Sequence, residues 1–278
     1  MTPTWLKLGF LAAMAAGLSA AGEKITLREG FPFVDVMVNG QGPFHMLLDT
    51  GATSSILSPK AAERAGVVPD QRSIMVTFSG EKVVPESSRN VIQVGQVREP
   101  GLPIVIMEVP RVRALDSRAD GVIAQTFLER VPFLLDYRHK TLWLGAEATQ
   151  EAARLSRSVR AIREVNRTLL PVTFEPGGRV WNLQLDSGAT NVVVNCAGEC
   201  PAASNTAPQG RLLTHTGEQT VTLGTMRHVS VGDHSIPPVE AVLTEASPER
   251  GLEDGVVPAR WFEAFYVNGQ TVRFDPAR

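Results

Sequence analysis

One seven-residue pattern occurs twice in this chain of 278 residues. Residues 47–53 read LLDTGAT, and residues 184–190, which lie 137 positions further along, read QLDSGAT. The same offset of 137 relates the Ser-Gly-Glu at 79–81 to the Thr-Gly-Glu at 216–218. Landmarks that keep one register over such a distance indicate a duplicated module rather than a short-period array. The fold must therefore be one that two similar halves can build together.

The register of this repeat shifts further along each half. The Asp-Gly-Val at 120–122 and the one at 254–256 lie 134 positions apart, and the alternating segments at 140–144 and 270–274 lie 130 apart. Deletions of this size belong in loops. We expect the two alternating segments to be the strands that close each half.

The chain divides into four segments on this pattern. Lys7 precedes an apolar run, and the small residues at 19–21 fit the cleavage site of a secretory signal peptide. An uncleaved anchor is the alternative, but the apolar stretch of about 14 residues is shorter than the roughly 20 that span a bilayer. We therefore expect an exported protein, periplasmic or secreted, with no stable membrane span after the signal is removed. The segments are a signal peptide at 1–21, an N-terminal lobe at 22–145, a linker at 146–167 and a C-terminal lobe at 168–278.

Local patterns predict an all-β protein. Short runs of Val, Ile and Leu are separated by Gly and Pro, of which the chain has 24 and 19. Residues 74–84 and 212–223 are each centred on a glycine and are typical of β-hairpins. The linker at 146–167 is rich in Ala, Glu and Arg and lacks Gly and Pro, which predicts a helix.

The chain has two cysteines, Cys196 and Cys200. In an exported protein this spacing predicts a small local disulfide. Two thiols without a nearby histidine are too few ligands for zinc, so we expect no metal site.

Charge is nearly balanced, with 27 basic and 29 acidic residues. No block of five or more Lys or Arg residues is present, so nucleic acid is not expected as a partner.

The two aspartates of the repeated pattern, Asp49 and Asp186, are the candidate catalytic residues. Each follows an apolar strand, which can hold a carboxyl group firmly. Two carboxyls about 3 Å apart cannot both ionise, so they share one proton. One carboxylate can then activate water while the other, still protonated, donates to a peptide carbonyl.

The neighbours of these aspartates can support the turns. Gly51 and Gly188 permit a tight turn with a close approach of the partner. The hydroxyls of Thr50 and Ser187 can donate across to the opposite turn and lock the two loops together.

The doubled Asp-Thr/Ser-Gly-Ala motif, the hairpin glycines and the Asp-Gly-Val-Ile segment at 120–123 resemble the aspartic proteases of the pepsin and retropepsin clan. The likeness is closest to bacterial retropepsin-like domains present in duplicate. It implies a bilobal pepsin-like acid protease fold, with two six-stranded β-barrel-like lobes and a cleft between them. It also implies a cofactor-free aspartic endopeptidase with Asp49 and Asp186 as its dyad, acting on an extended polypeptide held as an added strand. The flap positions that it implies are Ser79, Gly80, Thr216 and Gly217.

The chain departs from this family where an apolar-apolar-Gly sequence packs beneath each catalytic turn. Residues 122–124 read VIA and residues 256–258 read VVP. Two alternatives therefore stay open beside the protease. One is an inactive descendant of the fold that binds peptides or polymers. The other is a homodimer whose halves pair between chains, although we expect a monomer with pseudo-twofold symmetry.

The residue after each catalytic glycine leads to a prediction about pH. Pepsin-like sequences commonly have Ser or Thr there, whose hydroxyl can stabilise the ionised aspartate, whereas this chain has Ala52 and Ala189. We expect the rate of peptide cleavage to peak at mildly acidic to neutral pH. A pH–rate profile that peaks below about pH 3 would contradict this.

Overall fold

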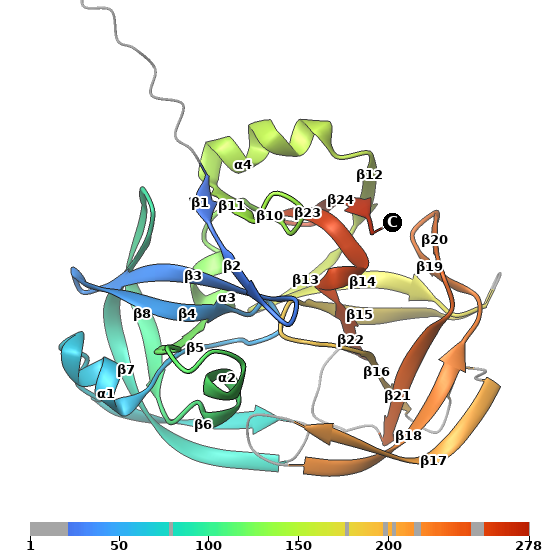
Figure 1. The fold of residues 1–278 in the computed structure, drawn as a ribbon, viewed down its shortest axis with the longest axis horizontal. Helices are drawn as coiled ribbons and strands as arrows, with labels where there is room; N and C mark the ends of the chain where they lie inside the picture. The colour runs from blue at the N-terminus through green and yellow to red at the C-terminus, as the bar shows by residue number, and fades with distance from the viewer. Residues whose placement is uncertain are drawn as a thin grey trace, which may run out of the picture.

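The computed structural model describes residues 22–77, 80–175, 178–196, 200–201, 204–213, 218–245 and 253–277. The expected signal peptide at 1–21 lies outside these ranges. Strands dominate the described chain and form three sheets (Figure 1), which confirms the prediction of a mainly β fold. None of the helices in these ranges is both long and apolar enough to cross a membrane.

The first lobe is built on one eight-stranded sheet. Strand β9 lies between β4 and β5, parallel to β4 and antiparallel to β5. This insertion fixes the end of β4, from which Asp49 follows. In sheet order the strands are β2 (Thr26–Arg28), β3 (Phe31–Val38), β4 (Gln41–Leu48), β9 (Gly121–Ile123), β5 (Ser55–Leu57), β8 (Val97–Ile106), β7 (Gly80–Val94) and β6 (Gln71–Thr77).

The second lobe repeats this insertion in a ten-stranded sheet. Strand β22 lies between β15 and β16, parallel to β15 and antiparallel to β16. In sheet order the strands are β17 (Ser204–Leu213), β18 (Glu218–Met226), β21 (Val239–Glu245), β16 (Val192–Cys196), β22 (Gly255–Pro258), β15 (Val180–Asp186), β14 (Arg167–Thr173), β19 (Val229–Val231) and β20 (His234–Ile236), with β13 (Ile162–Glu164) also on β14.

A third sheet of six strands joins the two lobes. Its central pair is β10 and β23, one from each half. The rings of Phe133 and Phe265 pack edge to face there, with centroids 6.0 Å apart. The closing strands β11 and β24 each pair with a strand of their own half, β10 and β23, and so lie on either side of this central pair rather than in the lobe sheets. In sheet order the strands are β1 (Glu23–Lys24), β11 (Thr141–Leu144), β10 (Phe133–Asp136), β23 (Phe262–Asn268), β24 (Thr271–Pro276) and β12 (Arg157–Arg160).

The linker is helical only in its first part. Helix α4 (Gly145–Glu151) continues into a 3-10 turn that ends at Arg154, after which the chain forms β12 and β13. The expectation of a helix through residue 167 is therefore wrong. Strand β12 pairs with β24 and buries Val159, and this tertiary pairing outweighs helix propensity.

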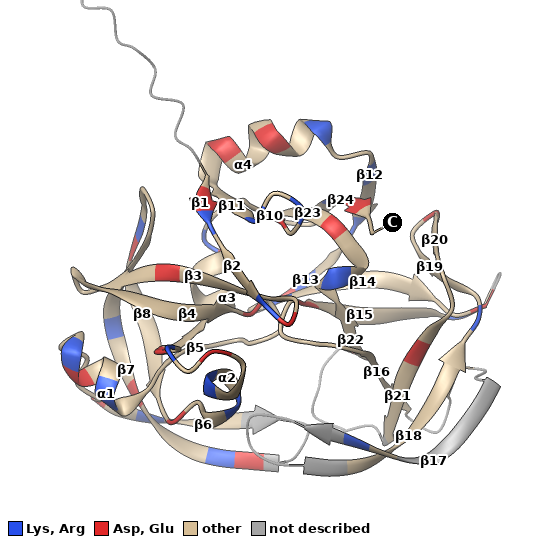
Figure 2. Ribbon diagram, viewed as in Figure 1, with Lys and Arg blue, Asp and Glu red and all other residues tan. Residues whose placement is uncertain are grey.

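The remaining helical segments are short, and every residue of α3 is buried. Charged side chains of both signs are interspersed along the described strands of both lobes (Figure 2). The remaining segments are α1 (Pro59–Arg64), α2 (Pro110–Leu115), α3 (Gln125–Leu128) and the 3-10 turn η2 (Ala259–Trp261).

The glycines of the repeated Asp-Gly-Val segment explain why each inserted strand fits. A methyl group on Gly121 would overlap the carbonyl oxygen of Ile56, and one on Gly255 would overlap that of Val193. The inserted strands can approach their neighbours this closely only without a side chain.

We predict that Gly121→Ala lowers the free energy of unfolding by roughly 3 kcal/mol, because the methyl group must push β9 away from β5. Denaturant unfolding would measure this. Gly40→Ala is the control, since open space surrounds that residue and only its positive φ of 77° adds a cost of about 1 kcal/mol. Equal losses for the two variants would contradict the close-approach explanation.

Candidate active site

Asp49 and Asp186 lie next to each other at the ends of corresponding strands. Asp49 follows β4, is 5% exposed, and shares a side-chain hydrogen bond with Asp186, the last residue of β15. A methyl group on Gly51 would overlap the Asp186 carboxyl, and one on Gly188 would lie 2.6 Å from Asp49 Oδ2. The structure therefore brings the two sequence-predicted aspartates together within one chain, and both glycines are needed for that approach.

Backbone N–H groups of each turn hold the carboxyls in place. Gly51 N and Ala52 N donate to Asp49 Oδ1 at 2.9 and 3.0 Å. Gly188 N donates to Asp186 Oδ1 at 2.6 Å. Such donors favour the ionised form of a carboxyl group.

Burial raises the pKa of Asp186 well above its usual range, and the neighbouring charge of Asp49 raises it further. Glu253 acts in the same direction. Burial and the charge of Asp186 also raise the pKa of Tyr137, whose ring packs against Phe265 in the shared sheet. One carboxyl of the pair thus keeps its proton at pH values where an ordinary aspartate has lost it.

Thr50 and Ser187 join the two turns through four reciprocal hydrogen bonds. Thr50 Oγ1 donates to the carbonyl of Leu185 at 2.8 Å and accepts from Ser187 N at 2.9 Å. Ser187 Oγ donates to the carbonyl of Leu48 at 2.7 Å and accepts from Thr50 N at 2.9 Å. Every donor in this set has a partner from the opposite half, which is the interlock expected from the sequence.

The residues that replace the family's packing glycines fit the turns. Ala124 is fully buried with an extended backbone, φ −130° and ψ −170°, which any residue adopts. Its N–H donates to Ser55 Oγ at 3.1 Å. Pro258 ends β22 opposite Asp186 with a φ of −64°, which suits a proline. Neither substitution displaces a catalytic turn, so the departure that favoured an inactive protein loses its physical basis.

Two buried glutamines at the site were missed by the sequence analysis. The Nε2 atom of Gln125 donates to the carbonyl of Thr50 at 2.9 Å, and that of Gln184 donates to the carbonyl of Gly51 at 3.0 Å. The signal available in the sequence was a mismatch in the repeat, because Gln184 stands where the first half has Leu47.

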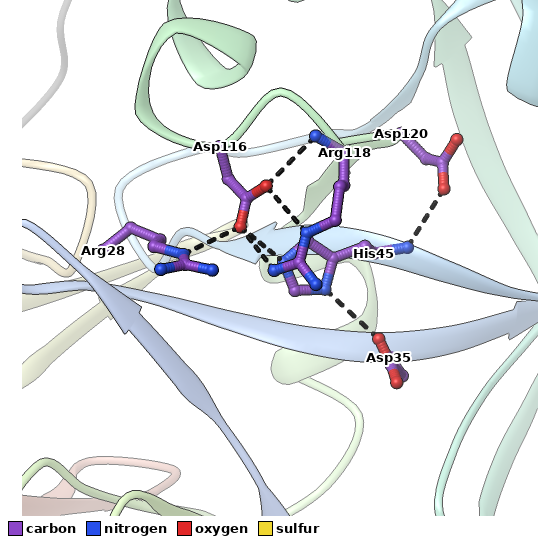
Figure 3. A network of polar contacts seen from close by, with 6 residues as sticks. All are labelled: Arg28, Asp35, His45, Asp116, Arg118 and Asp120. Carbon is purple, nitrogen blue, oxygen red and sulfur yellow. Dashed lines mark hydrogen bonds and ion pairs between the residues drawn. The ribbon is translucent and has the colours of Figure 1, made fainter.

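A second polar network anchors the strand that carries Asp49 (Figure 3). Asp120 accepts a hydrogen bond from the N–H of His45 in β4 at 3.1 Å, as Asp254 accepts one from Asn182 in β15 at 2.8 Å. The His45 ring lies between the carboxylates of Asp35 and Asp116.

Asp116 is the centre of this network. Its hydrogen bonds from Arg118 and Arg28 hold its pKa well below the usual range, so it stays ionised. The loop after α2 is thereby tied to β2 and β4.

The expected flap residues are only partly described. The β6–β7 ladder extends to the pair Thr77 and Gly80, and Ser79 lies outside the described residues. The β17–β18 ladder extends to Leu213 and Glu218, with Thr216 and Gly217 outside.

Cys196 and Cys200 form a disulfide at the end of β16, with Cα atoms 4.9 Å apart. In the described ranges no three acidic, histidine or cysteine side chains gather in a way that could hold a metal ion.

We predict that Thr50→Val and Ser187→Ala each lower the free energy of unfolding by about 2 kcal/mol, because each leaves a buried N–H and a buried carbonyl unpaired. The double variant should lose less than the sum, since separation of the turns breaks the remaining pair. Denaturant unfolding would test this. Thr53→Val is the matched control and should change stability by less than about 0.5 kcal/mol. Additive losses would argue against a single interlocked unit.

Comparisons with known proteins agree with this geometry. A family model described as aspartyl protease matches residues 34–127, which contain Asp49 and its turn. A crystal structure of the aspartic proteinase from Irpex lacteus superposes with a TM-score of 0.51 at 12% identity, covering 92% of this chain and 97% of that one. No curated protein sequence matches the chain. The aspartyl protease family model thus matches the first lobe, and the fold across nearly the whole chain is similar to that of an aspartic proteinase.

Proposed function

We propose that this protein is an aspartic endopeptidase in which Asp49 and Asp186 activate water for peptide hydrolysis. The observation that carries the proposal is the contact between two buried carboxyls, of which one holds its proton through burial and the charge of the other. Protease family and fold support the same chemistry.

The chemistry needs the pair in its singly protonated state. The carboxylate takes a proton from water as the water oxygen attacks the scissile carbonyl carbon, and the protonated carboxyl donates to the carbonyl oxygen. As the C–N bond of the resulting diol breaks, the protonated carboxyl donates its proton to the amine nitrogen, and the other carboxylate takes a proton from a diol hydroxyl as the product carboxyl group forms. The pair ends with the single shared proton with which it began, so no cofactor is required.

We propose an extended polypeptide as the substrate. Each lobe contributes one hairpin, β6–β7 and β17–β18, that would act as a flap over a strand-like peptide. Because both aspartates come from one chain, a monomer suffices for activity. The apolar segment before residue 22 supports an exported protein, in the periplasm or secreted.

Substitution of either aspartate tests the function. We expect Asp49→Asn and Asp186→Asn each to lower kcat/KM for a fluorogenic peptide library by about 1,000-fold or more, because one member of the acid–base pair is lost. Both variants should remain folded, since Asn removes a repulsive charge from a buried site.

Asp233→Asn is the control, an exposed turn residue between β19 and β20 that should retain full activity. Undiminished cleavage by either dyad variant would end the proposal.

A further inference from the structure

Two glutamine side chains converge on the backbone of the Asp49 turn. Gln125 is fully buried and Gln184 is 3% exposed. Gln125 Nε2 lies 2.9 Å from the carbonyl oxygen of Thr50, and Gln184 Nε2 lies 3.0 Å from that of Gly51 and 3.4 Å from that of Thr50. Because a carbonyl can only accept, these contacts fix which end of each amide faces the turn.

The two carbonyls belong to the peptide groups that hold the Asp49 carboxyl. The Thr50 carbonyl shares its peptide group with Gly51 N–H, and the Gly51 carbonyl shares its group with Ala52 N–H. These are the N–H groups that donate to Asp49 Oδ1. A hydrogen bond received at a carbonyl polarises the N–H of the same group, so each amide strengthens a donor to Asp49.

Within the residues that the structure describes, the turn of Asp186 lacks such support. The counterpart of Gln184 is Leu47, and the counterpart of Gln125 is Ala259, neither of which can donate. Along the described chain, no side chain donates to the carbonyls of Ser187 or Gly188, and Asp186 Oδ1 accepts a single backbone N–H. The two halves thus have equivalent aspartates, but only the turn of Asp49 receives hydrogen bonds from glutamine side chains.

Stability of the fold does not explain the arrangement. The Oε1 atom of Gln125 is buried and has no hydrogen-bond partner in the described structure. An unpaired buried acceptor is unfavourable, and an apolar side chain such as the one in the second half would avoid it.

We propose that Gln125 and Gln184 are positioning residues that place the negative charge of the dyad on Asp49 and leave the shared proton on Asp186. This inference rests on the proposed function in taking the pair as the reacting groups. Asp49 is then the base that takes the proton from water, and Asp186 is the acid. Glu253 acts on Asp186, and both aspartates interact electrostatically with Tyr137, on which Arg260 also acts. The glutamine variants leave these three groups in place.

The pH dependence of catalysis follows with a defined sign. Removing the amides weakens the donors that favour ionised Asp49, so the first ionisation of the pair moves to higher pH. The second ionisation removes the proton from Asp186, whose surroundings are unchanged. The acidic limb of the pH–rate profile should therefore move to higher pH, and the basic limb should keep its position.

The kinetic test compares Gln125→Met, Gln184→Met and the double variant, since Met keeps the length of the side chain and lacks a donor. We expect the acidic limb of kcat/KM to move up by roughly half to one pH unit in the double variant, with a smaller shift in each single variant. Leu170→Met on the neighbouring strand β14 is the matched control for a buried change to Met and should leave both limbs in place. A uniform loss of rate with an unmoved acidic limb would show a merely structural role and overturn the proposal.

A second measurement does not depend on activity. Carbon-13 NMR of protein labelled at the aspartate carboxyl carbons, with Asp49→Asn for assignment, reports how the first ionisation step divides between the two carboxyls. We expect most of that step at Asp49 in the unmodified protein, and a smaller share in the double variant or in Gln184→Leu, which places the first-half residue at this position. A first step centred on Asp186 would overturn the inference even if peptides are cleaved. If most of the first ionisation step occurs at Asp49 but the protein cleaves no peptide, the inference about the glutamines is supported and the proposed function is not.

Discussion

The structure depends on the reciprocal hydrogen bonds that the hydroxyl groups of Thr50 and Ser187 make with the opposite turn. Two carboxyl groups in contact repel each other whenever both are ionised, so they stay together only if the turns that carry them cannot separate. Each of these turns is held by hydrogen bonds from the opposite half. The strands behind the turns and the sheet that joins the lobes serve to keep these two loops at one distance.

The inserted strands and the shared sheet provide that rigidity from two directions. Strands β9 and β22 brace the ends of β4 and β15 from within each lobe, at a separation that only glycine permits. The six-stranded sheet then joins the lobes through the contact between β10 and β23.

The sequence predicted those parts of the fold and site that repeat. The offset of 137 between the two patterns pointed to the pairing of Asp49 with Asp186 and to the interlock of Thr50 with Ser187, both of which the structure contains. It could not predict the course of the linker, because β12 is a strand only through its pairing with β24 from the far end of the chain. Gln184 acts through a contact between the lobes and Gln125 through one within the first lobe, and both were missed because they stand where the repeat fails.

Joining the two halves into one polypeptide has a consequence for how such a site can change. A dimer of identical subunits must carry the same residue at equivalent places on both sides of its axis, so a donor gained behind one acid is gained behind both. In this chain the codons for positions 47 and 184 mutate separately, and the residues there are Leu and Gln. The covalent connection through α4 thus allows a division of labour between the acids that an association of equal copies forbids.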